Sequence, residues 1–432
     1  MVNYTKIMSL KRNPRILIGL HEVAGYNGNL KKGFDELEIE SIFMELSYHP
    51  FKYGGSETNN VLIKLIRYFT NKMSTQKEKV LNKFFWLYCH QAAKFFLFLC
   101  VLFKYDVFIF GYKTSFLHFY DLPILKFFKK KIVYIFYGSD SRPPYINGYY
   151  SDLPIQESIK ASYNQKKIIK KIERYADFII SHPASSHFHE RKFIPCMRMG
   201  IPSLRDWHKN VTPMLSGHKL RILHAPSDPK RKGTEIIRKI IKKLQLKGHS
   251  IELIEIIRKT NAEVLDELSR CDFIIDELYS DAAMAGFATE AAFFGKPAIV
   301  GGYANIYDWG ELPDEMTPPV HHCHPDEIEE AVEKLIVDEE YRKELGEKAK
   351  QFVQKYWSAK YVAERYLRLI KGEIPEDWFY DPPNISYLHG WGLSEQDAKT
   401  FLRKVIKNGG FKALQLSDKP ELEQKFIEFA NS

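Results

Sequence analysis

This 432-residue chain lacks the cysteine patterns of disulfide-bonded and zinc-binding proteins. Its five cysteines are scattered, odd in number and include no Cys-x-x-Cys pair. Disulfide-rich domains and structural zinc sites both need paired, regularly spaced cysteines. We therefore expect reduced thiols in a cytoplasmic protein.

Motifs of several well-known catalytic classes are also missing. The sequence contains no Gly-x-Ser-x-Gly elbow of hydrolases, no phosphate loop of the P-loop NTPases and no His-Glu-x-x-His metal site. It has no short repeat and no low-complexity tract, and residues 1–15 are polar and basic, so we expect no cleaved signal peptide. The run His-His-Cys-His at 321–324 is expected to be a surface loop, with a metal site as the alternative. Adjacent residues do not easily face one ion, so we expect no metal.

The charge is uneven along the chain. Between Met1 and Thr212, 32 lysines and arginines stand against 17 aspartates and glutamates, a balance of +15, whereas the remainder has a balance of −6. A basic half favours an anionic partner, such as a phospholipid surface, a lipid-linked glycan or an acidic polysaccharide. The basic residues are dispersed and no nucleic-acid-binding module is present, so we expect no nucleic acid.

Residues 84–103 form the most apolar stretch of the chain. Three polar residues interrupt it, namely His90, Gln91 and Lys94, so the uninterrupted part is too short to span a bilayer. We expect a helix that packs in the core. The alternative is a helix with one face on a membrane surface, which would make the protein peripheral at the inner face of a membrane.

Two series of short apolar runs alternate with helical patterns. Such runs are typical of parallel sheets that helices cover on both faces, so we expect an α/β protein with two Rossmann-like, doubly wound domains. The expected domains are a first Rossmann-like domain (1–205), a linker (206–218), a second Rossmann-like domain (219–357), and a crossover helix with a helical tail (358–432). Strands are expected at 15–20, 39–46, 106–110, 131–137, 177–181, 220–225, 251–256, 273–276 and 297–302.

A basic turn follows the first expected strand of the second series. Lys232 and Gly233 open an expected helix there, with Arg231 beside them. Cations and free amides at a helix N-terminus bind phosphate, so these residues are candidates to hold a nucleotide diphosphate. The alternative is a solvated basic turn.

A second candidate for nucleotide binding lies in the segment 286–297. Glu290 occupies an early position of an expected helix, where a carboxylate can accept hydrogen bonds from both ribose hydroxyls. Compensation of the helix dipole is the alternative. Gly286, followed by Phe287, lets the backbone approach the phosphates closely.

The first series offers weaker candidates at the ends of its strands. Gly25 and Gly28 do not form a dinucleotide fingerprint, but their amides can contact a donor phosphate, and His21 is a candidate for catalysis. Asp140 is a candidate general base and Arg142 a candidate for acceptor binding. A local Asp140–Arg142 ion pair is the alternative. Two further candidates in similar loop positions are His118, for the acceptor, and His182.

Six segments carry a family resemblance: HAPSDPKRKGTE, CDFIIDEL, TEAAFFGKPAIV, KYDVFIF, DLPILKFFKKKIVYIFYGSD and IERYADFIIS. Over residues 15–371 the chain resembles the GT-B glycosyltransferases, in particular the family 4 enzymes of bacteria and archaea, which implies that residues 1–205 bind the acceptor and residues 219–357 bind the donor. The resemblance implies two domains that face a cleft, with Lys232 at the donor diphosphate and Glu290 at the ribose. Two positions depart from the family pattern, because Ala282 and Ser227 stand where the family has glutamate and arginine. Arg231 and Asp281 are the nearest substitutes, at the phosphate and the sugar respectively.

The resemblance implies transfer of a sugar from a nucleotide donor, of UDP or GDP type, to a hydroxyl acceptor in a surface glycan or glycolipid. It further implies retention of anomeric configuration and no metal, and we expect no cofactor besides the donor. A front-face retaining reaction needs no strong protein base, whereas an inverting one would use Asp140. The alternatives are a GT-B sugar-nucleotide epimerase and a non-catalytic subunit, the latter suggested by Ala282.

Overall fold

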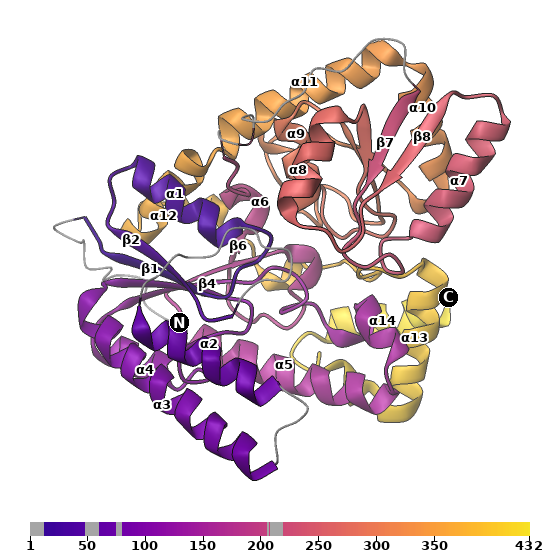
Figure 1. The fold of residues 1–432 in the computed structure, drawn as a ribbon. Coiled ribbons are helices and arrows are strands. Elements are labelled where there is room, and N and C mark those ends of the chain that lie inside the picture. The colour runs from indigo at the N-terminus through magenta and orange to yellow at the C-terminus, as the bar shows by residue number, and fades with distance from the viewer. Residues whose placement is uncertain (1–12, 48–59, 75–79, 205–206, 208–218) are drawn as a thin grey trace.

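A computed structural model describes residues 13–47, 60–74, 80–204, 207 and 219–432. The described chain contains two separate parallel sheets that follow one another along the sequence (Figure 1). Both sheets consist of short, buried apolar strands, which is the pattern that strands covered on both faces require.

The first sheet has six strands in the order β2-β1-β3-β4-β5-β6. Every residue of β1 and β3 is buried, because these strands lie inside the sheet with helices on both faces. The strands are β1 (Ile16–Leu20), β2 (Ser41–Glu45), β3 (Val107–Gly111), β4 (Lys131–Ile135), β5 (Phe178–Ser181) and β6 (Ile194–Pro195).

The second sheet has five strands in the order β11-β10-β9-β7-β8. The chain reverses direction across the sheet after β8, and in doubly wound sheets ligands bind where the order reverses, beyond the carboxyl ends of the strands. The strands are β7 (Leu220–His224), β8 (Ile251–Glu255), β9 (Phe273–Ile275), β10 (Ala298–Gly301) and β11 (His321–Cys323).

Helices cover both faces of each sheet. Alternate residues of the strands contribute to two different apolar clusters in each half, as the two-residue period of a strand demands. The helices of the first half are α1 (Tyr26–Glu36), α2 (Val61–Ser74), α3 (Val80–Lys104), α4 (Asp121–Phe127), α5 (Ile155–Tyr175) and α6 (Cys196–Met199). Those of the second half are α7 (Thr234–Leu246), α8 (Asn261–Arg270), α9 (Gly286–Phe293), α10 (Ile328–Val337) and α11 (Glu339–Tyr356).

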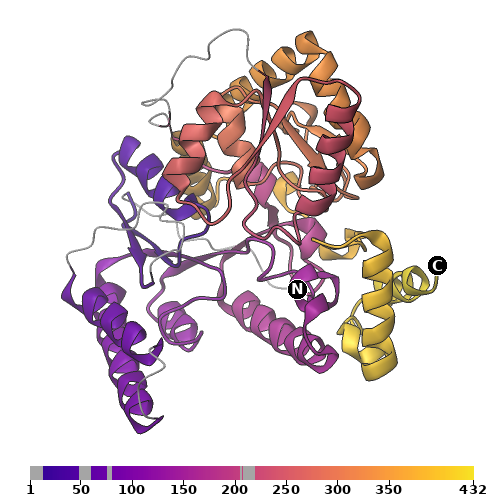
Figure 2. The same cartoon turned by 45° about the vertical axis from the view of Figure 1, so that its right-hand side comes forward.

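After the second sheet the chain returns to the first half. Helix α12 (Ala359–Lys371) packs on α1, and a Cβ atom at Gly33 would lie 2.0 Å from the Ala359 carbonyl oxygen, so the two helices approach as closely as glycine permits. Helix α13 (Glu395–Gly409) then packs on α5, and α14 (Pro420–Asn431) packs on α13, in the yellow segment of Figure 2. The tail is therefore part of the first half's core.

The predicted strands are present, with ends shifted by one or two residues, and the predicted crossover helix corresponds to α12. The structure adds β6 and β11. The predicted loop at 321–324 is wrong, because His321–Cys323 form β11, which pairs with β10. The predicted linker lies almost wholly outside the described residues, and the domain boundaries stay a prediction.

Candidate functional site

The loop after β1 meets the start of α9 where the two halves face each other. A Cβ atom at Gly286, the first residue of α9, would lie 3.4 Å from the Cβ of Ala24. Gly25 follows Ala24 in the left-handed conformation (φ 78°) and precedes α1. The structure thus brings Gly25 and Gly286, two predicted phosphate-binding positions 261 residues apart, to one place, with the N-terminal amides of α9 directed toward it.

The amide of Gly28 is already used within this loop. It donates to Glu22 Oε2 at 2.9 Å, while the amides of Val23 and Asn27 donate to Glu22 Oε1. Glu22 is buried, and burial raises its pKa to about 7 in spite of these three hydrogen bonds. Glu22 therefore shapes the loop, and Gly28 supports it instead of presenting its amide to a ligand.

Glu290 lies one turn into α9 and is nearly inaccessible, with 7% of its surface exposed. Its Oε1 accepts a hydrogen bond from Asn261 Nδ2 at 2.7 Å. Burial raises the pKa of Glu290 to about 8, and the neighbouring Asp276 adds to the shift. In this state the carboxyl group carries a proton at neutral pH.

Lys232 lies within a group of buried carboxylates. Its Nζ is 2.8 Å from Asp276 Oδ1 and 3.3 Å from Glu277 Oε2. Burial lowers the pKa of Lys232, but the two carboxylates outweigh burial and raise it, so the ammonium stays charged. Burial raises the pKa of Asp276. Burial also raises the pKa of Glu277, but Lys232 together with the hydrogen bonds from Ser280 and Trp391 lowers it by more. Lys232 is therefore a charged side chain that is paired with both carboxylates.

A segment of the tail also contacts Glu277. Trp391 Nε1 donates to Glu277 Oε2 at 2.9 Å, and Ser280 Oγ donates to Glu277 Oε1 at 2.8 Å. The backbone of Trp391 pairs with the first half, through Trp391 N to the Ile146 oxygen (3.0 Å) and Gly148 N to the Trp391 oxygen (2.9 Å). Residues 387–393, which we name the tail strap, thus join both halves.

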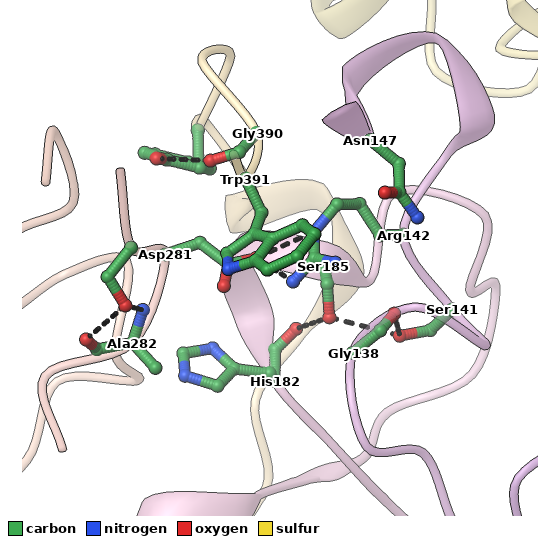
Figure 3. A network of polar contacts seen from close by, with 12 residues as sticks. Gly138, Ser141, Arg142, Asn147, His182, Ser185, Asp281, Ala282, Gly390 and Trp391 are labelled. Carbon is green, nitrogen blue, oxygen red and sulfur yellow. Dashed lines mark hydrogen bonds and ion pairs between the residues drawn. The ribbon is translucent and has the colours of Figure 1, made fainter. Parts of the chain in front are cut away.

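An ion pair between the halves lies beside the tail strap (Figure 3). Arg142 donates from Nε to Asp281 Oδ2 at 2.8 Å and also from Nη2, and the guanidinium is 5.5 Å from the centre of the Trp391 ring. Both charged side chains are more than nine-tenths buried. The alternative of a local Asp140–Arg142 ion pair is therefore wrong, because the partner of Arg142 is Asp281 of the other half.

Asp140 is buried at the end of β4. Its Oδ1 accepts a hydrogen bond from the Tyr137 amide at 2.8 Å, and its Oδ2 has no hydrogen-bond partner among the described residues. Burial raises the pKa of Asp140 to about 6. A carboxyl with such a pKa can take up and release a proton near neutral pH, as a general base must.

The three candidate histidines lie in different surroundings. Neither ring nitrogen of His182 has a hydrogen-bond partner in the described part of the chain, and Figure 3 shows its ring on the side of Ala282. His21 stacks on Tyr112, with ring centres 4.8 Å apart. Burial lowers the pKa of all three imidazoles, and that of His118 is lowered further by Lys94 of α3, which places His118 beside that helix.

Arg231 and Gly233 line a separate cavity of about 620 Å³ between the two halves and the tail. Arg231 pairs with Asp152 of the first half, and a Cβ atom at Gly148 would lie 2.9 Å from its Cδ. Gly233 has φ 75°, and a Cβ atom there would lie 2.6 Å from that of Leu278, so glycine is required. The other lining residues include Lys230, Glu235, Tyr279, Leu393, Asp397, Phe401 and Lys404.

The predicted nucleotide-binding residues thus fall into two neighbouring groups. Gly25, Gly286 and Glu290 lie where the first loop meets α9, with Phe287 partly buried beside them, whereas Arg231 and Gly233 line the cavity. Lys232 lies among the buried carboxylates; it pairs with Asp276, whose charge in turn acts on Glu290.

The roles of Glu22, Glu277 and Trp391 were not predicted from the sequence. For Trp391 the available signal was a tryptophan between two glycines in a polar tail. Among the described residues no group of three or more His, Cys, Asp or Glu is placed to hold a metal ion.

Comparisons with known proteins give a result in structure but not in sequence. No protein-family model and no curated protein matches the sequence. The sucrose-phosphate synthase of Thermosynechococcus elongatus is similar in structure with a TM-score of 0.50 and 14% identity, over 84% of this chain and 99% of that one. HepE of Anabaena, in complex with UDP and glucose, has a TM-score of 0.47 and 9% identity, over 83% and 100%.

The architecture is that of the GT-B glycosyltransferases: two parallel sheets of six and five strands with flanking helices, followed by C-terminal helices. This confirms the predicted fold class. At these identities the likeness shows the fold alone, so membership of glycosyltransferase family 4 stays a prediction.

Proposed function

We propose that this protein transfers a sugar from a nucleotide-diphosphate donor to a hydroxyl group, at the boundary between its two sheets. The observation that carries the proposal is the meeting of the Ala24–Gly25 loop with the start of α9, one turn before Glu290. A helix N-terminus attracts the diphosphate, and a carboxylate one turn into the helix accepts hydrogen bonds from ribose hydroxyls.

In this proposal each group has one role. The α9 amides at Gly286 bind phosphate, Glu290 binds ribose, and Asp281 with Arg142 lies nearest to the position of the sugar. The donor is of UDP or GDP type. Transfer is retaining and needs no metal, with Lys232 offsetting charge on the leaving diphosphate; an inverting reaction would use Asp140 as its base.

The acceptor in this proposal is an anionic or lipid-linked glycan, and the reaction belongs to the synthesis of a surface polysaccharide or glycolipid in the cytoplasm. Its support is the +15 balance of residues 1–212, because such a field concentrates anionic molecules near the first half.

One observation favours a second function, that of a non-catalytic binding subunit. Lys232 is already paired with Asp276 and Glu277, so its charge is not available to a phosphate in this conformation. Ala282 also stands where the resembling enzymes have a carboxylate.

A thermal-shift panel tests donor binding directly. The nucleotides are UDP, GDP, ADP, CDP and dTDP with their common sugars, and a ligand at about 100 times its Kd stabilises the protein by about 2.7 kcal/mol. We expect one base to raise Tm, Glu290→Ala to abolish the shift, and Glu340→Ala, which removes an exposed carboxylate from α11, to retain it.

The bound nucleotide sugar is then incubated with the enzyme and followed by NMR. Release of the nucleotide in the presence of acceptor extracts supports transfer, and isomerised donor without acceptor would indicate an epimerase. Binding with neither reaction would favour the non-catalytic subunit, whereas no shift with any nucleotide would refute both donor-dependent functions.

A further inference from the structure

Helix α3 presents a continuous apolar face to solvent. Phe84, Tyr88 and Phe103 are 66%, 75% and 64% exposed, although aromatic side chains of this size usually lie inside a protein. At about 100° per residue seven of the exposed apolar residues fall within an arc of about 120° and extend over about 29 Å of helix, and Leu87, which is 42% exposed, lies about 60° to one side. The residues of this face are Phe84, Phe85, Tyr88, Phe95, Phe96, Leu99 and Phe103.

The opposite side of α3 is anchored in the protein. Leu97, Phe98 and Val101 are buried in the core of the first half, and the buried Lys94 donates to the Ser115 oxygen at 3.4 Å. Asn82–Lys104 is long and apolar enough to cross a membrane by length and composition, but only 33% of its most apolar window is buried in the protein. A helix with one face fixed to a folded domain and one face free lies along an interface instead of crossing it.

The end of α4 extends this surface. Phe127 is 81% exposed, and the Phe128 ring lies 5.4 Å from that of Phe103 with an edge-to-face orientation. Both views of the fold place α3 at the outer edge of the first half, on the side away from the second sheet (Figures 1 and 2). Contiguous apolar patches of this kind mark interaction sites.

The charges around the apolar face identify the chemistry of the partner. Helices α2 and α3 together contain six lysines and arginines and no aspartate or glutamate. Lys83 and Lys104 stand at the two ends of α3, outside the apolar arc, and Lys129 follows the exposed phenylalanines at the end of α4. Exposed aromatic residues on a helix with lysines at its ends, and with no acidic residue in α2 or α3, match the interface of an anionic bilayer, where rings enter the headgroup region and ammonium groups meet phosphates.

We infer that α3, with the adjoining end of α4, docks this protein on an anionic lipid surface. The helix lies in the plane of the membrane with its aromatic face among the headgroups. The inference deepens the proposed function, because a lipid-linked acceptor would be held on the same surface, but docking itself does not require transfer to occur.

Sedimentation with vesicles tests the docking. The full chain is mixed with vesicles of phosphatidylcholine alone and with vesicles that also contain phosphatidylglycerol. The variant Phe84→Ser/Tyr88→Ser/Phe96→Ser removes three exposed rings, and the control Leu246→Ser/Phe411→Ser removes two exposed apolar side chains from α7 and the tail. Circular dichroism and thermal unfolding confirm that each variant is folded.

We expect the wild type and the control to bind the anionic vesicles, and we expect the triple variant to bind at least about tenfold more weakly. Binding should fall when salt is raised or when phosphatidylglycerol is omitted. Equal binding by the triple variant, or no binding by the wild type, would overturn the inference. A dimer of the wild type that the triple variant loses would show instead that a second copy covers the face. Nucleotide binding, measured on the same variants, reports the proposed function separately, because none of the three rings lies near Glu290.

Discussion

The proton on Glu290 gives the sharpest prediction for donor binding. A neutral carboxyl has one oxygen that donates, whereas an ionised carboxylate accepts hydrogen bonds at both oxygens, as two ribose hydroxyls require. Burial raises the pKa of Glu290 to about 8, so the free protein must lose a proton before the nucleotide can bind in this way. Donor binding should therefore strengthen as pH rises.

The size of this effect follows from the fraction of protein that is ionised. The apparent Kd equals the intrinsic Kd divided by this fraction, which for a pKa of about 8 is about one-tenth at pH 7 and about nine-tenths at pH 9. Binding at pH 7 should thus be about tenfold weaker than at pH 9, and binding at pH 6 about tenfold weaker again. Each binding event should release close to one proton below pH 7.

Isothermal titration calorimetry measures both quantities. The ligand is an intact nucleotide sugar, because a free diphosphate itself takes up a proton at about pH 6 and would add its own pH dependence. Titrations in two buffers with different ionisation enthalpies give the number of protons released. Glu290→Gln keeps the shape of the side chain but cannot ionise, so its weaker binding should be independent of pH. A flat pH profile for the wild type, or an unchanged slope for Glu290→Gln, would show that Glu290 does not bind the ribose as a carboxylate.

Three further results should follow from the buried charges. Because the pKa of Glu290 is raised, the folded state keeps a proton that the unfolded state loses above about pH 4.5. The free energy of unfolding should therefore fall by up to about 1.4 kcal/mol per pH unit between about pH 4.5 and about pH 8. Urea unfolding curves measured over this pH range should show a smaller fall for Glu290→Gln. Asp281→Asn leaves Arg142 buried without its anion and should lower the free energy of unfolding by about 3–5 kcal/mol. The double variant Arg142→Met/Asp281→Leu should recover most of this lost free energy, because it leaves no unpaired buried charge. No recovery would mean that the ion pair itself stabilises the fold. Trp391→Phe removes the hydrogen bond to Glu277 and should cost about 1–3 kcal/mol, and an unchanged Tm would show that the tail strap holds the halves by its backbone alone.

The fold could be predicted because its signals are local. Runs such as Ile-Leu-Ile-Gly-Leu at 16–20 are apolar throughout, and the helical patterns between them fix the parallel connection. The two strands that sequence analysis missed lack this signal. Strand β6 has two residues, one of them a proline, and β11 is His-His-Cys, which lies in the sheet because β10 offers it a hydrogen-bonding edge.

The residues of the candidate site could be predicted one by one, but which of them form ion pairs with one another could not. Arg142 and Asp281 were both identified as candidates, yet they are 139 positions apart, and nothing in the flanking residues of either indicates the other. The local alternative for Arg142 was Asp140, two residues away. Both carboxylates are buried, and what differs is the partner: Asp140 accepts the Tyr137 amide within its own turn, whereas Arg142 donates to Asp281 of the other half.

Lys232 shows how such long-range contacts change the chemistry of a site. From sequence it is a free cation at the start of a helix, but in the fold it forms an ion pair with Glu277, which also accepts a hydrogen bond from a tryptophan 114 residues away. A diphosphate gains the charge of Lys232 most fully when Glu277 moves away or takes up a proton, because Asp276 and Glu277 already neutralise the buried ammonium. Either change breaks or weakens the bond from Trp391. Donor binding and the position of the tail strap are therefore linked through one carboxylate, and a nucleotide sugar that engages Lys232 should loosen the contact between the tail and the second half.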